Sequence, residues 1–347
     1  MKTKTAVIYG VNDVRVCERE LREVKENHVL IKVGACNLCT SEYGIYGGGR
    51  SNRKLPMTFG HEWAGTVVEV GSNVKSVKVG DFVGGNYEYD VYSEEARNGF
   101  TSVAPGIKSY DTTWSDGFYG RYEGCSEYVL LSQEAIYKFD NKISYSEAGF
   151  LEPLATVVSG IEKLKLSKNQ NVLIIGAGTM GILNALVCKY EGYNVFVSEM
   201  MSNKIEKAKE YDLNVIDLNV EDLIESLKDK TNGAMMDAVI VAAGSTKANQ
   251  QGFAALKKNN GKILLFAAGY PSPEVGVDAN FIHYGNTEVY GTFLADYHHF
   301  KHSAFLLANG HVKVDKLIDN TYTLDKVKEA LDEANVPGKY RISVVME

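Results

Sequence analysis

Short apolar runs rich in β-branched and aromatic residues mark the first 150 residues of the chain. Gly and Asn turns bound each run, which is typical of β-strands. The stretch between Asn86 and Gly124 has little periodicity and is rich in Tyr, Gly and Ser, so we expect long loops there. We therefore expect a β-dominated first unit, with strands at Thr5–Tyr9, His28–Ala35, Gly65–Val70, Asp81–Gly85 and Glu127–Leu131.

From about Ser146, short apolar strands alternate with longer segments of helical periodicity. This alternation is typical of a parallel sheet with crossover helices, and six strands at this spacing fit a doubly wound α/β fold. The tail should return to the first unit. The predicted strands are Asn171–Ile175, Asn194–Ser198, Val215–Asp217, Asp237–Ala242, Lys262–Ala267 and Glu288–Gly291, followed by a helix through Leu307, a short strand, a helix around Asp325 to Ala334 and a last strand, Arg341 to Met346.

The length of 347 residues exceeds the about 100–200 residues of one usual domain. We predict one domain from residues 1–150, completed by residues 292–347, and a second domain from residues 151–291. We find no internal repeat and no Pro- or Ser-rich linker between the two.

Composition and charge narrow the classes of function. Hydrophobic residues make up 45% of the chain and charged residues 23%, as in ordinary globular proteins. The net charge is −7 and no basic run interleaves with aromatics, so we expect no nucleic-acid partner. No apolar stretch approaches the ~20 residues that span a bilayer, and no apolar segment follows the start, so we expect no membrane partner and a cytoplasmic location. The five cysteines are an odd count, which favours reduced thiols.

The strand Asn171–Ile175 runs directly into the glycine pattern G-x-G-x-x-G, and Ile182 to Tyr190 then has helical periodicity. The glycines permit a tight turn, close approach of the backbone to a pyrophosphate, and packing of helix on strand. Glu199 follows the next strand, where an acid accepts hydrogen bonds from the adenosine ribose. The predicted dinucleotide-binding residues are Gly176, Gly178, Thr179, Met180, Gly181 and Glu199.

Glu199 also favours NAD over NADP, because its carboxylate would repel a 2′-phosphate and no arginine follows within ten residues. Lys204 and Lys207 could weaken this preference for NAD, although we favour their interpretation as a solvated helix face.

Cys36-Asn-Leu-Cys39 ends a predicted strand, and Gly60-His61-Glu62 follows about twenty residues later. A catalytic zinc uses three protein ligands and an open position, and Cys39, His61 and Glu62 would supply a thiolate, an imidazole and a carboxylate. Taken singly, the cysteines could be core residues or a redox pair, and the His-Glu pair could cap a helix.

The combination of Cys39-Thr-Ser41, the run from Gly60 to Gly71, Val79-Gly80-Asp81 and the glycine fingerprint resembles the zinc-dependent medium-chain dehydrogenase family. The resemblance covers essentially the whole chain, and Glu152-Pro-Leu-Ala155 resembles the sorbitol and threonine dehydrogenase branch. It implies a GroES-like catalytic domain beside a Rossmann domain, and a homodimer or homotetramer.

The resemblance also implies one catalytic zinc held by Cys39, His61 and Glu62, with Glu152 ligating directly or holding a metal-bound water. Ser41 would be the first proton-relay hydroxyl, and Thr156 would lie against the nicotinamide. The implied chemistry is Lewis-acid activation of an alcohol oxygen, with hydride transfer to the nicotinamide.

The chain departs from the family pattern at three places. Residues 86–124 hold no cysteine, so no structural zinc is expected. Tyr43 and Gly44 stand where several members have a relay histidine. Gly291-Thr-Phe-Leu-Ala295 lacks the arginine that polyol dehydrogenases often have, which makes sorbitol itself doubtful as the substrate.

Several other clusters admit two interpretations. The basic residues Arg50, Arg53 and Lys54 could bind a substrate phosphate or form a solvated loop. His298, His299 and His302 could hold a second metal or form a surface cluster. Aromatic residues of the predicted loops could stack on a sugar, line a subunit interface or pack in the core; they are Tyr87, Tyr89, Tyr92, Tyr110, Trp114, Tyr119 and Tyr122.

The sequence therefore predicts a zinc- and NAD-dependent enzyme that oxidises a secondary alcohol on a polyol, sugar alcohol or sugar-alcohol phosphate. A threonine or 2,3-diol dehydrogenase is the alternative substrate class. A zinc-free reductase would not need Cys39, His61 and Glu62 together, and a non-catalytic dinucleotide-binding protein would be expected to show damage to this set or to Ser41. A methyltransferase would need no zinc ligands.

Overall fold

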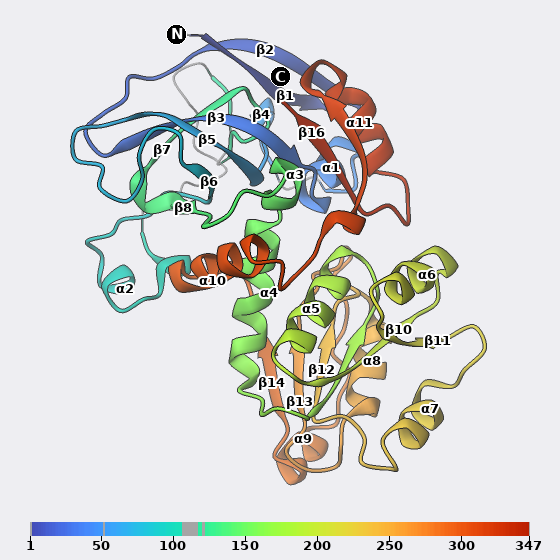
Figure 1. The fold of residues 1–347 in the computed structure, drawn as a ribbon. Helices are drawn as coiled ribbons and strands as arrows, with labels where there is room; N and C mark the ends of the chain where they lie inside the picture. Colours follow the sequence, from blue (N-terminus) through green and yellow to red (C-terminus); the bar gives the residue numbers. More distant parts are fainter. Residues whose placement is uncertain (1, 51–52, 106–116, 120–121, 347) are drawn as a thin grey trace. The chain divides into compact units, whose positions relative to one another are not determined.

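The computed structural model describes residues 2–50, 53–105, 117–119 and 122–346 (Figure 1). The chain divides into two compact units, unit 1 with residues 1–155 and 295–347, and unit 2 with residues 156–294. One division falls inside helix α4 (Leu151–Leu164) and the other follows the last strand of unit 2. Both lie a few residues from the expected boundaries. Tyr110 and Trp114 lie outside the described residues.

Unit 1 is rich in β-strands, as predicted for the first 150 residues, and most of its strand pairs are antiparallel. One sheet has the strand order β15-β16-β3-β5-β6-β8, with β7 also paired to β3, and a three-stranded sheet has the order β2-β1-β4. The strands are β1 (Lys2–Gly10), β2 (Asp13–Glu20), β3 (His28–Asn37), β4 (Met57–Thr58), β5 (Glu62–Val70), β6 (Phe82–Gly85), β7 (Tyr128–Ser132), β8 (Ile136–Lys138), β15 (Ile318–Thr323) and β16 (Arg341–Val345); the helices are α1 (Thr40–Tyr46), α2 (Glu94–Arg97), α3 (Tyr145–Ala148), α10 (Tyr297–Ala308) and α11 (Val327–Ala334).

The C-terminal tail returns to unit 1, as predicted. Strand β16 pairs antiparallel with β3 through Ser343 and Asn37, and β15 pairs parallel with β16. Helix α11 buries Val327, Ala330 and Leu331 in the core of the unit, since these residues recur at helical spacing on one face. The tail therefore completes the unit that carries the predicted metal ligands.

The segment after β6 contains short helices where the sequence predicted only loops. Ser93 caps helix α2, because its hydroxyl accepts a hydrogen bond from the Ala96 N–H at 3.1 Å. Two further hydrogen bonds of 2.8 Å attach this segment to the start of α10: the Ser102 N–H donates to Asp296, and the Tyr297 N–H donates to Thr101. Protein hydrogen bonds thus fix this cysteine-free segment.

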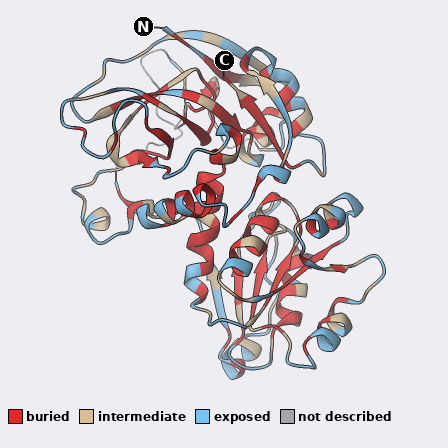
Figure 2. Cartoon of the chain, viewed as in Figure 1, coloured by how far each residue is buried: buried red, intermediate tan, exposed pale blue. Residues whose placement is uncertain are grey.

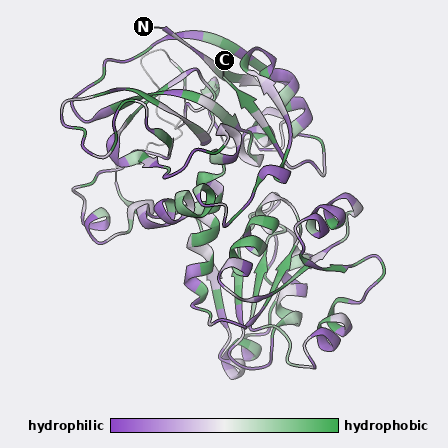
Figure 3. Ribbon diagram, viewed as in Figure 1, coloured by the Kyte–Doolittle hydropathy of each residue, from purple (hydrophilic) through white to green (hydrophobic). Residues whose placement is uncertain are grey.

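Unit 2 is a six-stranded parallel sheet with the order β11-β10-β9-β12-β13-β14. This is the strand order of a doubly wound dinucleotide-binding fold. Its central strands are buried and apolar, which is expected when helices cover both faces of a parallel sheet (Figures 2 and 3). The strands are β9 (Asn171–Ile175), β10 (Asn194–Glu199), β11 (Asn214–Asp217), β12 (Ala238–Val241), β13 (Lys262–Leu265) and β14 (Glu288–Gly291); the helices are α5 (Thr179–Tyr190), α6 (Ser202–Glu210), α7 (Leu223–Lys230), α8 (Thr246–Ala255) and α9 (Ala279–Gly285).

Among the described residues, no helix has the length and apolar character needed to cross a membrane.

Candidate active site

Paired strands bring the two predicted metal motifs together. Strands β3 and β5 are antiparallel, with Asn37 opposite Glu62, so the end of β3 lies beside the start of β5. Cys39 follows β3 and caps helix α1, and His61 directly precedes β5. Glu152 lies in the first turn of α4, also within unit 1.

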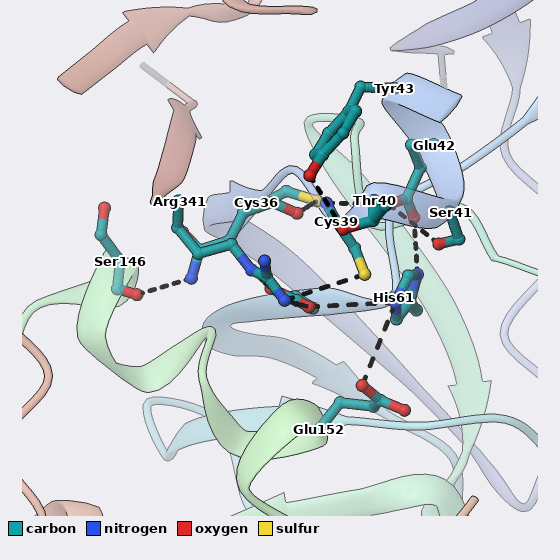
Figure 4. Close-up of polar contacts among 12 residues, drawn as sticks. Cys36, Cys39, Thr40, Ser41, Glu42, Tyr43, His61, Ser146, Glu152 and Arg341 are labelled. Carbon is teal, nitrogen blue, oxygen red and sulfur yellow. Dashed lines mark hydrogen bonds and ion pairs between the residues drawn. The ribbon is translucent and has the colours of Figure 1, made fainter. Parts of the chain in front are cut away.

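The side chains of these residues converge (Figure 4). Ligand-type atoms of Cys39, Glu42 and His61 lie within 4.8 Å of one another, and so do those of His61, Glu62 and Glu152. His61 Nε2 is 4.0 Å from Glu62 Oε1 and 4.0 Å from Glu152 Oε2. The four predicted ligands therefore form one cluster with His61 at its centre.

Glu42 belongs to this cluster but was not predicted from the sequence. Its Oε1 lies 2.5 Å from His61 Nδ1, and its Oε2 accepts a hydrogen bond of 2.9 Å from the Cys39 N–H. A carboxylate on one imidazole nitrogen fixes the tautomer and leaves the other nitrogen available as a ligand. The capping-box spacing of Cys39 and Glu42 is the sequence signal that could have revealed it.

Burial and the neighbouring charged groups shift the pKa values of Glu42 and His61 in opposite directions. Burial raises the pKa of Glu42, but His61 and the Cys39 N–H lower it, and the result lies below its usual range. Burial lowers the pKa of His61, but Glu42 and Cys39 raise it well above its usual value. A metal bound at His61 Nε2 would therefore compete with a proton.

Arg341 was not predicted from the sequence as a member of the site. Its Nε and Nη2 donate to the two carboxylate oxygens of Glu62, each at 2.7 Å, and both side chains are buried. Nη2 also donates to Cys39 Sγ at 3.8 Å. Both oxygens of Glu62 are thus engaged by a guanidinium.

Glu152 is the buried carboxylate that faces His61 from α4. Burial raises its pKa to about 7, with Glu62 and Glu42 adding to the rise and His61 and Arg341 opposing it. A buried acid held near neutrality by its surroundings is typical of a functional site. A nearby cation would favour its ionised form.

The two cysteines of the C-x-x-C motif have different roles. Cys36 is fully buried in the apolar core of unit 1, whereas Cys39 lies in the cluster around His61. Burial and the neighbouring Cys125 thiol hold the pKa of Cys36 well above its usual value, with the thiol contact the larger cause. Ser41 follows Cys39 in α1, and its hydroxyl donates to Glu42 Oε2 at 3.3 Å.

In unit 2 the glycine loop has the backbone that its sequence requires. Gly176 has a φ of +97°, and a Cβ on Gly181 would lie 1.9 Å from the Gly176 carbonyl oxygen. Gly178 precedes α5, and a Cβ there would meet only Lys204 Nζ, at 3.7 Å. Thr179 and Met180 begin helix α5, where the helix N-terminus favours an anion.

Glu199 ends strand β10 beside this loop. Its carboxylate accepts hydrogen bonds from the N–H groups of Ala177, Met200 and Met201 at 2.7 to 2.9 Å. A cavity of about 390 Å³ is lined by Gly176 and Glu199 together with Glu221, Asp222 and Lys247. Thr156 lies on α4 in unit 2.

Several residues of the remaining clusters have packing or pairing partners. Lys207 pairs with Glu210 on α6, and Lys54 lies over the ring of Tyr119. Tyr87 is buried and donates to the Ala295 carbonyl. His299 is buried, and its Nδ1 accepts a hydrogen bond from the Asp296 N–H at 2.9 Å, so it caps α10.

Replacing Glu42 by Gln should weaken zinc binding. At a pH well above the His61 pKa we expect the zinc affinity to fall roughly 10–100-fold, because the amide of Gln is a weaker hydrogen-bond partner for the imidazole than the carboxylate. Zinc binding to the unaltered protein should weaken as pH falls through the raised pKa of His61, and this fall should shift to lower pH in the variant. Chelator competition across pH measures both effects.

Glu147→Gln is the matched control for this variant, because Glu147 closes the same kind of capping box with Ser144 in a different helix, α3. Equal losses in the two variants would assign the effect to helix capping rather than to the imidazole.

Comparison with known proteins agrees with this geometry. Residues 25–141 match the family of alcohol dehydrogenase GroES-like domains, and residues 179–309 match the family of zinc-binding dehydrogenases. The L-threonine 3-dehydrogenase of Pyrococcus abyssi (strain GE5 / Orsay) is 32% identical over 343 residues, which is 96% of this chain and 93% of that protein. The chain belongs to the zinc-dependent medium-chain dehydrogenase family.

Other relatives define the class of reaction. The sorbitol dehydrogenase of Bacillus subtilis (strain 168) is 27% identical over 340 residues, 95% of this chain and 93% of that protein. A Sinorhizobium meliloti 1021 structure with bound NADP, described as a zinc-binding dehydrogenase, has the same fold, with a TM-score of 0.87, 22% identity and 99% coverage of both chains. The protein is an oxidoreductase that acts on CH–OH groups, as the sequence predicted.

Proposed function

We propose that the protein oxidises a secondary alcohol of a polyol, sugar alcohol or sugar-alcohol phosphate to the ketone, reversibly, with one zinc ion and NAD. The observation that carries the proposal is the cluster of a thiol, an imidazole and three carboxylates, in which two groups of ligand-type atoms share His61. Thiolate, imidazole and carboxylate are the ligands that zinc prefers.

The residues of the cluster fit a zinc ion. Glu42, Glu62, Glu152 and the Cys39 thiol face only two cationic side chains among the described residues of the cluster, His61 and Arg341. A divalent cation would balance this excess of acidic groups. When bound, zinc supplies a Lewis acid that lowers the pKa of an alcohol hydroxyl.

His61 is the residue that the two donor groups share, and Cys39 belongs to one of them. His61 is held by Glu42 at Nδ1, so Nε2 is the nitrogen left to ligate. Glu62 is engaged by Arg341 through both oxygens, so Glu152 is the better third ligand in this arrangement. Ser41 Oγ is assigned the first transfer of the alcohol proton, since it lies in the same helical turn as Glu42.

A single zinc is proposed because residues 86–124 contain no cysteine. Two hydrogen bonds, from the Ser102 N–H to Asp296 and from the Tyr297 N–H to Thr101, attach this segment to the start of α10. Four cysteine ligands, as structural zinc sites commonly need, are not provided there.

The preference for NAD rests on the carboxylates of the cofactor cavity. Glu199, Glu221 and Asp222 line it, against one lysine, Lys247. A 2′-phosphate would be repelled there, while ribose hydroxyls could donate to Glu199. The bound NADP of the Sinorhizobium meliloti protein belongs to that protein and shows that this fold can hold NADP.

Replacing Glu199 by Ala is expected to reduce the preference for NAD over NADP. The ratio of kcat/KM for the two cofactors measures the effect, and we expect a fall of about tenfold or more, corresponding to at least about 1.4 kcal/mol of lost discrimination. Glu206→Ala is the control, since Glu206 is exposed on α6, pairs with Lys209 and does not line the cavity. An unchanged ratio in Glu199→Ala would remove Glu199 from cofactor selection.

The substrate is best sought with the purified, zinc-loaded protein and NAD, following reduced cofactor. The panel should contain pentitols, hexitols, their phosphates, threonine and 2,3-diols. A chelator-sensitive signal with polyols supports the proposal, and a preference for threonine or a 2,3-diol supports the alternative substrate class. A signal that survives removal of zinc would reject the zinc mechanism. Activity with phosphates alone would implicate Arg50, Arg53 and Lys54.

We also propose a cytoplasmic homodimer or homotetramer. Strand β14 is an edge of the parallel sheet, and the side chain of Val289 on it is exposed. Tyr284 and Phe293, close to β14 in sequence, are 76% and 82% exposed. An open strand edge with exposed apolar side chains favours pairing with a second copy. Light scattering in solution gives the number of subunits.

A further inference from the structure

Gly60 and Gly124 allow the chain segment before β7 to lie very close to the segment that carries His61. The Gly124 N–H donates to the Gly60 carbonyl at 2.9 Å, and the Cys125 N–H donates to the Phe59 carbonyl at 3.1 Å. A Cβ on Gly60 would lie 2.3 Å from the Cys125 nitrogen, and a Cβ on Gly124 would lie 2.6 Å from the Gly60 oxygen. The backbones can approach this closely only because neither residue has a side chain.

The same two segments are joined by two more backbone hydrogen bonds, further along the chain from the glycines. The Tyr119 N–H donates to the Pro56 carbonyl and the Thr58 N–H donates to the Tyr119 carbonyl, both at 2.8 Å. Tyr122 lies between these two sets of hydrogen bonds, and His61 directly follows Gly60. The rings of Tyr122 and His61 are consequently in contact, with centroids 5.1 Å apart and planes inclined by 43°.

The contact is buried and adds a constraint that Glu42 does not supply. Tyr122 is 9% exposed and the His61 side chain is 11% exposed. Glu42 holds one nitrogen of the imidazole, but a hydrogen bond at Nδ1 still allows the ring to tilt about that contact. The terminal torsion of histidine is broad, so its ring plane is set by packing. Tyr122 packs against that ring.

We propose that Tyr122 is a positioning residue for the metal ligand His61, holding the plane of the imidazole so that Nε2 stays directed at the centre of the cluster. The proposal rests on the zinc site of the proposed function. The role belongs to the aromatic ring rather than to the phenol hydroxyl. Ring-on-ring packing of this kind contributes beyond the area that it buries, and supporting contacts of ligands commonly alter metal affinity about 10–100-fold.

The test compares metal binding by three variants. Tyr122→Leu removes the ring and keeps an apolar side chain, Tyr122→Phe keeps the ring, and Tyr119→Leu removes a tyrosine of the same segment whose ring lies near Lys54 Nζ at 5.7 Å. Zinc affinity is measured by chelator competition, and ligand geometry by the visible spectrum of the cobalt-substituted protein. Far-UV circular dichroism checks the fold of each variant.

We expect Tyr122→Leu to bind zinc roughly tenfold or more weakly and to shift the cobalt bands, with Tyr122→Phe and Tyr119→Leu close to the unaltered protein. Unchanged affinity and spectrum in Tyr122→Leu would overturn the proposal. So would an equal loss in Tyr119→Leu, or a loss in folded Tyr122→Phe as large as that in Tyr122→Leu. If Tyr122→Leu does not fold, a loss of zinc affinity in folded Tyr122→Phe would still overturn the assignment of the role to the ring.

These readouts separate the inference from the proposed function. A protein that fails to bind zinc or cobalt at all, before any substitution, contradicts the proposed zinc site. A protein that binds the metal normally and loses affinity in Tyr122→Leu supports the positioning role whichever alcohol is the substrate.

Discussion

Replacing Cys39 by Ala is expected to abolish alcohol oxidation while NAD binding persists. Cys39 supplies the thiol of the cluster, and Arg341 donates one hydrogen bond to it rather than the two that engage Glu62. Losing it should release the metal, and the cost should exceed the about 10²–10³-fold in kcat that removal of a single transition-state donor costs in other enzymes. The glycine loop and Glu199 lie in unit 2, so the affinity for NAD should change little.

Cys36→Ala is the matched control, because Cys36 lies three residues earlier in the same motif and is buried in the core of unit 1. Metal content, NAD affinity by calorimetry and turnover should be measured in both variants. Zinc and turnover lost together in Cys39→Ala, with both kept in Cys36→Ala, is the expected pattern. Full turnover in zinc-free Cys39→Ala would reject the zinc mechanism, and equal losses in the two variants would favour a redox pair.

The elements of unit 2 follow closely from local patterns in the sequence. The predicted strand Asn171–Ile175 is β9 with the same bounds, and the predicted Glu288–Gly291 is β14. Strand β9 is apolar and largely buried and is followed directly by Gly176, and β10 ends at Glu199, so the ends of these two strands are marked. The glycine loop was predicted for the same reason, since Gly176 must adopt a left-handed φ at the turn.

Strand β2 was not predicted, because its charged residues leave no clear alternation of apolar and polar positions. Its sequence Asp-Val-Arg-Val-Cys-Glu-Arg-Glu from Asp13 to Glu20 has polar residues at most positions, and hardly any of it is buried. It is stabilised by pairing with β1 along almost its whole length rather than by an apolar face. Such a strand depends on its partner, and a partner is not visible in a local window.

The residues of the candidate site also fall into two groups, those that a local sequence pattern reveals and those that it does not. Cys39 and the Gly60-His61-Glu62 run stand out because ligand types occur at motif spacing. Arg341 does not stand out, because it meets Glu62 across 279 residues of sequence, and the pairing of β16 with β3 brings it there. Tyr122 likewise reaches His61 through the close approach of Gly60 and Gly124. Contacts that require tertiary pairing carry no local signal.

Replacing Arg341 by Met should destabilise the metal-free protein strongly. Arg341 and Glu62 form a bidentate ion pair, and their side chains are 5% and 1% exposed. Removing the guanidinium leaves the Glu62 carboxylate buried without its partner, which in other proteins costs about 3–5 kcal/mol of unfolding free energy. Replacing both residues by Met removes both charges, so the double variant should recover most of the loss.

Urea unfolding of the metal-free protein measures this difference through tryptophan fluorescence. Both tryptophans, Trp63 and Trp114, belong to unit 1 in sequence, and Trp63 directly follows Glu62, so the signal reports that unit. A loss below about 1 kcal/mol in Arg341→Met would mean that the buried carboxylate takes up a proton or finds another partner. Zinc should reduce the loss in Arg341→Met, because a cation in the cluster replaces part of the missing positive charge. A loss that zinc leaves unchanged would place the metal too far from Glu62 to act on it, and Glu62 would then be a structural partner of Arg341 and not a ligand.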